Sequence, residues 1–324
     1  MDVLLVGLGR WGEKHLRVLR EVGATVWVAD VSPERRQWAI AHGVAPVHAV
    51  DDYRAALDRV QAVDIVTPAD SHLAIAETCL RAGKHCFIEK PLTRTAAEGR
   101  QLVATAREAG RVVQVGHIFR FHPATAVLEE ALATDRIGAV RYATGRFSGF
   151  KRPRTDVGVF QTDGIHYVDL FRHLLRRDPT GVSSLERDFL GRGLDDLSVT
   201  VVHYGDVPAV IEANYFVPGT HRECVIVGER GSLVADYGTA VVTLHRGVHQ
   251  RVGTGWEAVD AGKEELPTNG GEPLRLELEA FLDACAGRRA VPVTAGDGLL
   301  ALEVTAAATL SARLGRLVTL AEAR

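Results

Sequence analysis

The feature that most constrains the fold of this chain is a regular alternation of strand-like and helix-like segments over its first 116 residues. Short apolar runs typical of buried strands lie at 2–7, 25–30, 62–67, 85–89 and 112–116. Between them, apolar residues recur at helical spacing at 13–23, 32–43, 71–82 and 94–109. Because strands that alternate with helices of this length pair in parallel, the pattern predicts a parallel sheet with helices on both faces.

A different pattern begins after Pro123. A helical stretch precedes longer strands, at 140–148, 197–204, 207–217, 222–229, 231–237 and 240–246. Apolar and polar residues alternate visibly in the second and fourth of them. Short turns join several of these strands, which indicates a mostly antiparallel sheet. Helical patterns return at 274–286 and 295–314. A chain of 324 residues has room for two domains, so we expect an α/β domain over 1–120 and an α+β domain with an open sheet over 121–324.

The charge balance and the cysteines exclude several classes of protein. The net charge is −3, from 38 basic and 41 acidic residues, so nothing attracts nucleic acid or a membrane surface. The four cysteines form no C-x-x-C pair, and we interpret them as reduced thiols, with neither a disulfide framework nor a zinc site. The first residues carry no basic segment, and no stretch reaches about 18 apolar residues. We therefore expect no signal peptide, no membrane span and a cytoplasmic location.

The sequence VGLGRWG places Gly7, Gly9 and Gly12 between the first strand and the first helix. In this context the first glycine permits a tight turn, the second lets a pyrophosphate approach the backbone, and the third lets the helix pack closely on the strand. The N–H groups at the start of the helix can then bind phosphate. The spacing predicts a Rossmann dinucleotide-binding domain over 1–120. The alternative is a glycine turn that binds no ligand.

Asp30 ends the second strand, 18 residues after Gly12. A carboxylate there accepts hydrogen bonds from the adenosine ribose hydroxyls and repels a 2′-phosphate, so NAD is predicted rather than NADP. Arg35 and Arg36 are close in sequence and can attract that phosphate, so NADP is not excluded. The alternative interpretation of Asp30 is a surface aspartate.

A lysine stands where the fourth strand ends, in the sequence CFIEKPLT. Pro91 restricts Lys90 to extended backbone conformations, and the bond between them can be cis. Thr67 and Pro68 end the third strand at the same carboxyl edge, where ligands of such sheets bind. An ammonium group held there can stabilise the oxyanion that develops when a hydride leaves an alcohol. The alternative is a solvated lysine at a strand end.

Five motifs together resemble the glucose–fructose oxidoreductase/inositol dehydrogenase (Gfo/Idh/MocA) family: GLGRWG, TPADSH, EKPL, VGHIFRFHP, and EPLRLELEAFLDAC with DGLLALEV. The resemblance covers essentially the whole chain, and the E-K-P motif is its most specific part. It implies a Rossmann domain, a second domain on an open and largely antiparallel sheet, and NAD(P)-linked oxidation or reduction of a sugar or cyclitol. Carried over by position, the residues that line the dinucleotide are Gly7, Leu8, Gly9, Arg10, Trp11, Asp30, Thr67, Pro68, His72, Glu89 and Lys90. The last of these also contacts the substrate.

Oxidation of an alcohol also requires a group that moves the hydroxyl proton, and His166 is the candidate. The sequence predicts a helix with Thr162 or Asp163 as its N-cap and His166 in its first turn. Asp163 lies three residues before His166 and can orient the imidazole on a shared helical face. Similar enzymes show D-x-x-x-H here, and Thr162 stands in place of that aspartate. Asp163 therefore either replaces it or only caps the helix, and His166 without a chemical role is the structural alternative.

Basic residues at 148–158 form a candidate substrate loop. Lys151, Arg152 and Arg154 suit a phosphate or carboxylate, which favours an acidic sugar, a sugar phosphate or a sugar nucleotide, although a solvated loop is the alternative. Arg120 lies near the predicted domain boundary, where it either contacts substrate or pairs across the junction. The predicted substrate contacts are Lys90, Arg120, Lys151, Thr162, Asp163 and His166. The remaining histidines do not cluster as metal ligands do, so no metal is predicted.

These features predict an NAD(P)-dependent oxidoreductase that transfers hydride between nicotinamide and a secondary alcohol or ketone of a sugar, a sugar derivative or a cyclitol. One alternative is a glycosidase of the same fold that retains NAD. Another is a non-catalytic protein that binds NAD(H) or a sugar, and the fold also hosts imine and biliverdin reductases. The alternating strands of the second domain need a cover on one face, so we expect a homodimer or homotetramer.

Overall fold

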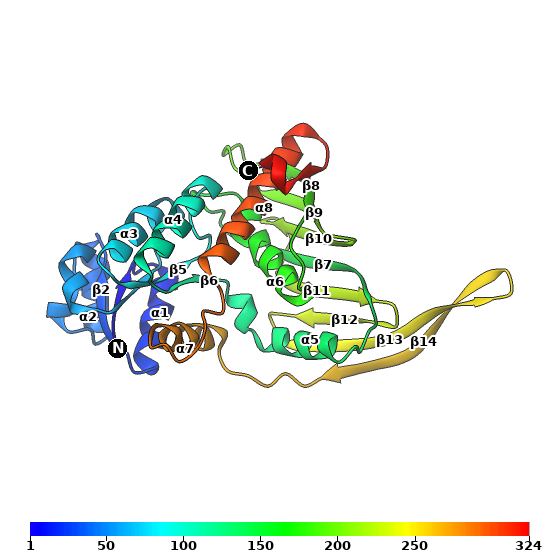
Figure 1. The fold of residues 1–324 in the computed structure, drawn as a ribbon, viewed down its shortest axis with the longest axis horizontal. Helices are drawn as coiled ribbons and strands as arrows, with labels where there is room; N and C mark the ends of the chain where they lie inside the picture. Colours follow the sequence, from blue (N-terminus) through cyan, green and yellow to red (C-terminus); the bar gives the residue numbers. More distant parts are fainter. Residues whose placement is uncertain (324) are drawn as a thin grey trace. The chain divides into compact units, whose positions relative to one another are not determined.

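A computed structural model describes residues 1–323, which form two compact units (Figure 1). The first unit comprises Met1–Ile118 and Glu272–Leu302. The second comprises Phe119–Gly271 and the described residues from Glu303 on. The first division thus falls between Ile118 and Phe119, and residues 272–302 belong to the first unit.

The first unit is built on a parallel six-stranded sheet of order β3-β2-β1-β4-β5-β6. Its strands are β1 (Asp2–Val6), β2 (Thr25–Ala29), β3 (Ala49–Val50), β4 (Ala62–Ile65), β5 (His85–Glu89) and β6 (Val113–Gly116). The helices between them are α1 (Arg10–Glu21), α2 (Pro33–Ala41), α3 (Ala69–Arg81) and α4 (Ala96–Ala109). The strand order reverses between β1 and β4, and ligands of such sheets bind outside the carboxyl ends of the strands at this reversal. The predicted doubly wound sheet is confirmed.

Local signals in the sequence explain where these helices begin. The side chain of Ser32 accepts a hydrogen bond from the backbone of Arg35 at the start of α2. Thr95 and Glu98 form a reciprocal capping box at the start of α4, which satisfies two backbone donors at once. Short 3-10 helices at Pro46–His48, Tyr53–Arg59 and Ile118–Phe121 complete the connections.

Helix α7 (Pro273–Cys285) packs on the first unit although it lies far away in the sequence. Leu274, Leu278 and Phe281 are buried in the same apolar core as β1 and α1, and Phe281 meets Phe87 edge-on at 5.7 Å between ring centroids. Burial of such side chains contributes about 1.5–3 kcal/mol each, which explains why this helix leaves the second domain. Helix α8 (Ala295–Leu314) begins in the first unit and ends in the second.

The second unit is built on a nine-stranded sheet of order β14-β13-β12-β11-β7-β10-β9-β8-β15. Its strands are β7 (Val140–Gly149), β8 (Gly181–Arg187), β9 (Leu197–Tyr204), β10 (Val207–Asn214), β11 (Thr220–Gly228), β12 (Gly231–Asp236), β13 (Val241–Val252), β14 (Gly255–Leu266) and β15 (Val318–Thr319). The pair of β10 with β7 is parallel and the other pairs are antiparallel, so the predicted mostly antiparallel sheet is confirmed. Its helices are α5 (Pro123–Ala133), α6 (Ile165–Leu175) and α9 (Leu320–Ala323).

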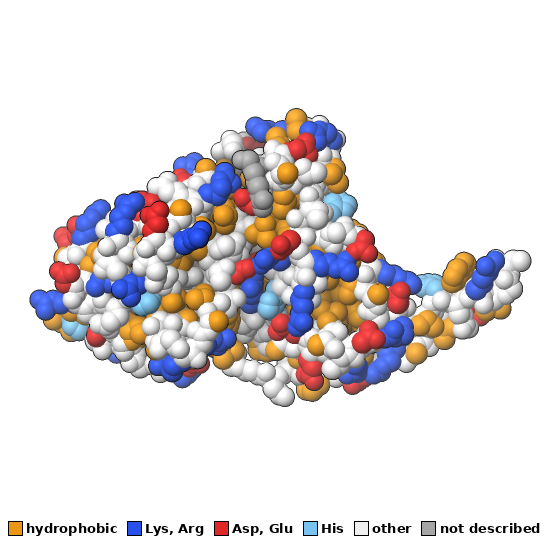
Figure 2. All heavy atoms as spheres, in the orientation of Figure 1, with side chains coloured by type: hydrophobic (Ala, Val, Ile, Leu, Met, Phe, Trp, Pro, Cys, Tyr) orange, Lys and Arg blue, Asp and Glu red, His pale blue; other side chains and the backbone are white. Residues whose placement is uncertain are grey.

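The hairpin of β13 and β14 extends beyond the rest of its sheet (Figure 1). We predicted a strand only as far as residue 246, but β13 continues to Val252 and β14 covers 255–266. Nearly all side chains of the distal part are exposed, and apolar and charged groups are mixed along it (Figure 2). The sequence there lacks a buried apolar face, so it carries no strand signal. No helix among residues 1–323 is long and apolar enough to cross a membrane.

Candidate active site

The glycine loop between β1 and α1 has the geometry of a phosphate cradle. Gly7 has φ of 98°, and a Cβ there would lie 2.7 Å from the carbonyl oxygen of Val66. A Cβ on Gly12 would lie 2.1 Å from the carbonyl oxygen of Gly7, so helix and turn approach as closely as predicted. A Cβ on Gly9, the N-cap of α1, would meet no protein atom within 4 Å, and no side chain caps this helix. The first N–H groups of α1 therefore suit a pyrophosphate.

Asp30 is fixed beside this loop. Its carboxylate accepts hydrogen bonds from the backbone N–H of Leu8 at 2.7 Å and of Ser32 at 2.9 Å. Arg35 donates to the carbonyl of Leu8 at 2.6 Å and forms an ion pair with Glu13. Arg36 donates to the carbonyl of Asp30 at 2.7 Å. Both arginines that we expected to compete for a 2′-phosphate thus have partners in the protein, and the carboxylate remains the charge best placed for a ribose.

A buried ionic network lies behind the E-K-P motif. His15 Nδ1 is 2.8 Å from Asp64 Oδ2, and His15 Nε2 is 3.2 Å from Glu89 Oε1. Burial lowers the pKa of His15, but the two carboxylates outweigh it and raise the pKa to about 10. Burial raises the pKa of Glu89, yet His15, Lys90 and Trp11 hold it below its ordinary value. The ring is therefore an imidazolium between two carboxylates, and it joins α1, β4 and β5.

The Glu89 carboxylate connects this network to the catalytic candidate. It accepts a hydrogen bond from Trp11 Nε1 at 2.6 Å and from the backbone N–H of Lys90 at 3.1 Å. A Cβ on Gly116 would lie 2.9 Å from Glu89 Oε1, so only glycine leaves room for this carboxylate. The bond between Lys90 and Pro91 is cis. The indole N–H of Trp11 thus binds Glu89, and contact of Trp11 with the dinucleotide stays a prediction.

His72 supports two loops of the first unit. Its ring is buried, with Nδ1 3.0 Å from the carbonyl oxygen of Pro91 and Nε2 2.9 Å from that of Thr67. Burial lowers the pKa of His72 despite these two carbonyls. The ring therefore joins the loops that follow β4 and β5, and its contact with the dinucleotide stays a prediction.

In the second unit, His166 lies in the first turn of α6 as predicted. Neither Thr162 nor Asp163 caps this helix, because a π-helical turn at Phe160–Gly164 leads into it and its N-cap is Gly164. Such i→i+5 turns are rare and occur often at functional sites. His166 is 5 % exposed, and its ring stacks on Phe119 at 4.7 Å and on Phe147 at 5.3 Å between centroids. The aromatic rings fix the plane of the imidazole.

The predicted substrate residues of this unit have the following partners. Asp163 is buried, and its Oδ2 lies 2.7 Å from Lys151 Nζ, which also lies over the ring of Tyr215 at 5.5 Å. Thr162 donates a hydrogen bond to the carbonyl of Gly158 at 2.8 Å. The structure thus brings the basic loop and the turn before α6 together.

The other basic side chains of this region either form ion pairs or are exposed to solvent. Arg120 forms a two-pronged ion pair with Asp169 of α6, at 2.8 Å and 2.5 Å, so it pairs within its own unit. Arg154 pairs with Asp156 at 2.8 Å, and Arg152 is exposed. Only Lys151 of the three basic loop residues is directed at the turn before α6.

Sequence reasoning missed several residues of these sites. They are His15, Asp64, Phe119, Phe147, Tyr215 and Arg222. The one local signal is His15, three residues after Gly12 and therefore on the same face of α1. The others meet across strands and helices that are far apart in the sequence, so no spacing reveals them.

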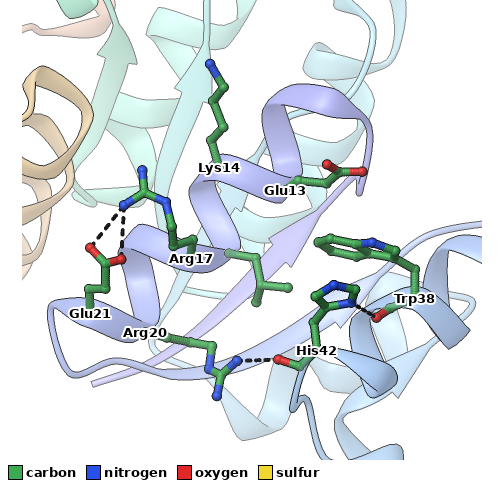
Figure 3. A pocket seen from close by; sticks show the side chains of 8 residues that line it. Glu13, Lys14, Arg17, Arg20, Glu21, Trp38 and His42 are labelled. Carbon is green, nitrogen blue, oxygen red and sulfur yellow. Dashed lines mark hydrogen bonds and ion pairs between the residues drawn. The ribbon is translucent and has the colours of Figure 1, made fainter.

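A separate depression of about 640 Å³ is lined by side chains of α1 and of the end of α2 (Figure 3). It is lined by Glu13, Lys14, Leu16, Arg17, Arg20, Glu21, Trp38 and His42. Neither the glycines of the loop nor Lys90 contributes to it, so it is distinct from the dinucleotide site. No group of three potential metal ligands occurs among the described residues 1–323.

A doubly wound parallel sheet with this glycine loop, an acidic residue at the end of β2 and a lysine at the end of β5 defines a Rossmann dehydrogenase. The chain matches the descriptions "Oxidoreductase family, NAD-binding Rossmann fold" over residues 1–117 and "Oxidoreductase family, C-terminal alpha/beta domain" over 129–320. It therefore belongs to the Gfo/Idh/MocA oxidoreductase family. The predicted enzyme class and the NAD cofactor are confirmed.

Curated relatives cover nearly the whole chain. The UDP-N-acetylglucosamine 3-dehydrogenase of Acidithiobacillus ferrooxidans is 31 % identical over 309 residues, or 94 % of each chain. The scyllo-inositol 2-dehydrogenase (NAD⁺) of Bacillus subtilis is 30 % identical over 338 residues, 98 % of this chain and 95 % of the relative. A solved structure of the Acidithiobacillus enzyme superposes with a TM-score of 0.79 at 27 % identity and covers 100 % of this chain and 99 % of its own.

Proposed function

We propose that this protein oxidises a secondary alcohol, or reduces the corresponding ketone, of a sugar, a sugar derivative or a cyclitol. The relatives named above act on a sugar nucleotide and on a cyclitol, which supports this substrate range. The observation that carries the proposal is the network that holds the backbone of Lys90 through Glu89 at the carboxyl edge of the sheet. Bound NAD supplies the hydride acceptor or donor.

Lys90 is proposed to stabilise the oxygen of the reacting carbon. An ammonium group that donates a hydrogen bond to this oxygen stabilises the negative charge that develops during oxidation, and removal of one such donor costs about 10²–10³ in kcat. The backbone N–H of this residue is held by Glu89 at 3.1 Å, so the strand end that carries the ammonium is fixed.

His166 is proposed as the general acid/base that moves the hydroxyl proton. Its ring is nearly buried and held against Phe119 and Phe147, which sets the direction of its nitrogens. Asp163 and Thr162 are proposed to contribute to substrate binding from the preceding turn, together with Lys151. For Arg120 we propose support of α6 through its ion pair with Asp169.

Native mass spectrometry followed by fluorescence titration with NADH and NADPH tests the cofactor, and a panel of sugars and cyclitols with NAD tests the reaction. We expect NADH to bind more tightly than NADPH, and Lys90→Met to lower turnover by about 10²–10³ while NADH still binds. Lys84→Met is the matched control, since this lysine precedes β5 on the opposite edge. A dinucleotide that never exchanges and is not consumed would instead support the NAD-retaining glycosidase. Full turnover by the Lys90 variant would contradict the proposed role.

We further propose a homodimer or homotetramer in the cytoplasm. The half-covered residues of β10 and β12 alternate with buried ones, so one face of the nine-stranded sheet is only partly covered within the chain. Light scattering after gel filtration tests the oligomeric state, and a monomer at micromolar concentration would refute it.

A further inference from the structure

Arg222 lies close to the proposed acid/base residue although its sequence position gave no hint of this. It stands on β11 directly opposite Phe147 of β7, so both side chains lie on the same face of the sheet. The guanidinium carbon is 3.3 Å from the centroid of the Phe147 ring. That ring in turn lies nearly parallel to His166, at 9° and 5.3 Å. One aromatic ring therefore contacts both the guanidinium and the imidazole.

The cations around this face differ in their partners. Three other cations have carboxylate partners, in the pairs Lys151–Asp163, Arg154–Asp156 and Arg192–Asp196. Arg222 forms no ion pair with a carboxylate in the described part of the chain. It donates from one terminal nitrogen to the carbonyls of Ser148 at 2.9 Å and His221 at 2.6 Å. Its direct partners are therefore backbone carbonyls, and the Asp163 carboxylate acts on it without forming an ion pair.

Half-burial makes this cation a strong potential anion partner. Burial lowers the pKa of the Arg222 guanidinium, and the nearby Asp163 carboxylate and Tyr167 only partly oppose this effect. A guanidinium has five N–H donors, and the bonds to Ser148 and His221 both use the same terminal nitrogen. Nε and the second terminal nitrogen therefore keep donors for a ligand. Such a fork matches a carboxylate or a phosphate, and a partly desolvated pair is stronger than a pair in water.

We propose that Arg222 binds an anionic substituent of the substrate, a carboxylate or a phosphate, and makes the enzyme selective for acidic over neutral sugars. This inference rests on the proposed function, because it assumes that the substrate lies against His166. Lys151, with its Nζ 4.9 Å from the same Phe147 ring, adds to the positive potential while it holds Asp163. A negatively charged substituent would give Arg222 the anionic partner that it lacks among residues 1–323.

The test compares Arg222→Met, which keeps a long side chain against Phe147 but removes charge and donors, with Arg222→Lys, which keeps the charge without the fork. Arg146→Met is the matched control, because Arg146 lies on β7 next to Phe147 but pairs with Glu212 of the neighbouring strand β10. The substrates are glucose, glucuronate, glucose 6-phosphate, N-acetylglucosamine and UDP-N-acetylglucosamine, each with NAD. Glucuronate distinguishes recognition of a carboxylate from that of a phosphate.

We expect the wild-type enzyme to prefer an anionic sugar to its neutral counterpart. Arg222→Met should lower the ratio of their kcat/KM values about 10- to 100-fold, mostly through KM, as expected for a charged hydrogen bond made equally before and during reaction. The ratio for Arg222→Lys should lie between those of the wild type and Arg222→Met. Arg146→Met should keep the wild-type ratio. An unchanged ratio in Arg222→Met would overturn the inference and show that Arg222 only packs on Phe147.

A binding measurement separates failure of this inference from failure of the proposed function. Calorimetry in the presence of NADH measures the affinity of each sugar without turnover. Tighter binding of anionic sugars that disappears in Arg222→Met supports the inference even if no sugar is oxidised, in which case the proposed reaction fails. Equal affinity for neutral and anionic sugars in the wild type refutes the inference even if sugars are oxidised. Thermal melts of both variants check that they fold.

Discussion

His15 offers the most demanding test of the first unit, because it is a buried cation between two buried carboxylates. Replacement by leucine fills similar space but leaves Asp64 and Glu89 without their shared cation. Loss of one member of a buried ionic network costs about 3–5 kcal/mol, since the remaining charge stays uncompensated. We therefore expect His15→Leu to lower the free energy of unfolding by this amount.

The shift of the His15 pKa corresponds to an effect of the same order. A rise of the His15 pKa from 6.5 to about 10 corresponds to about 5 kcal/mol of extra stability of the charged form in the folded protein. The pKa of Asp64, however, is raised by its burial despite the charge of His15. Burial of this carboxylate therefore destabilises the folded protein and offsets part of the stabilisation from His15. The lower end of the range, about 3 kcal/mol, is therefore the better expectation.

Urea unfolding followed by tryptophan fluorescence measures the effect, because Trp11 contacts Glu89 in the same network. The double variant His15→Leu with Asp64→Asn should recover a large part of the loss, since it removes one of the two uncompensated charges. His42→Leu is the control: His42 is exposed, and we expect a change within about 0.5 kcal/mol. A loss below about 1 kcal/mol in His15→Leu, or no recovery in the double variant, would refute the reasoning.

The pH dependence of the stability difference between wild type and His15→Leu tests whether His15 is charged in the folded protein. The pKa of His15 is higher in the folded than in the unfolded protein, so its stabilising contribution is complete below pH 6.5 and is lost as the pH rises toward about 10. The stability difference between wild type and His15→Leu should therefore shrink between pH 6.5 and 9.5. A difference that grows over this interval would show that His15 is not held as a cation.

Three further substitutions test the dinucleotide site and the acid/base group. His166→Gln should lower kcat by about 10²–10⁴ and remove one limb of the pH–rate profile, which steady-state NADH formation measures. Asp30→Ala should reduce the preference for NADH over NADPH by about tenfold or more in fluorescence titration, since one charge-assisted hydrogen bond is worth about 1.5–3 kcal/mol. Gly12→Ala places a Cβ 2.1 Å from the carbonyl oxygen of Gly7, so we expect loss of NADH-dependent stabilisation in a thermal melt. Gly23→Ala is the control for backbone effects alone, because a Cβ there meets nothing within 4 Å.

The first unit shows how far local patterns reach. Strand–helix alternation, Gly7 and Gly12, and Asp30 at the end of β2 are readable because each acts within a few residues of itself. The parallel sheet and the glycine loop follow from them, whereas the enzyme class followed from the resemblance of five motifs to a known family. The end of β5 is similar, because Pro91 restricts the backbone of Lys90 to extended conformations.

Tertiary structure alone decided the features that join distant parts of the chain. It placed α7 on the first unit, made His15 the partner of Asp64 and Glu89, and brought Arg222 and His166 to the same aromatic ring. It also replaced the expected cap of α6 by a π-helical turn. Backbone propensity and apolar periodicity report only on neighbours along the chain, whereas burial and charge compensation depend on which side chains packing brings together in space.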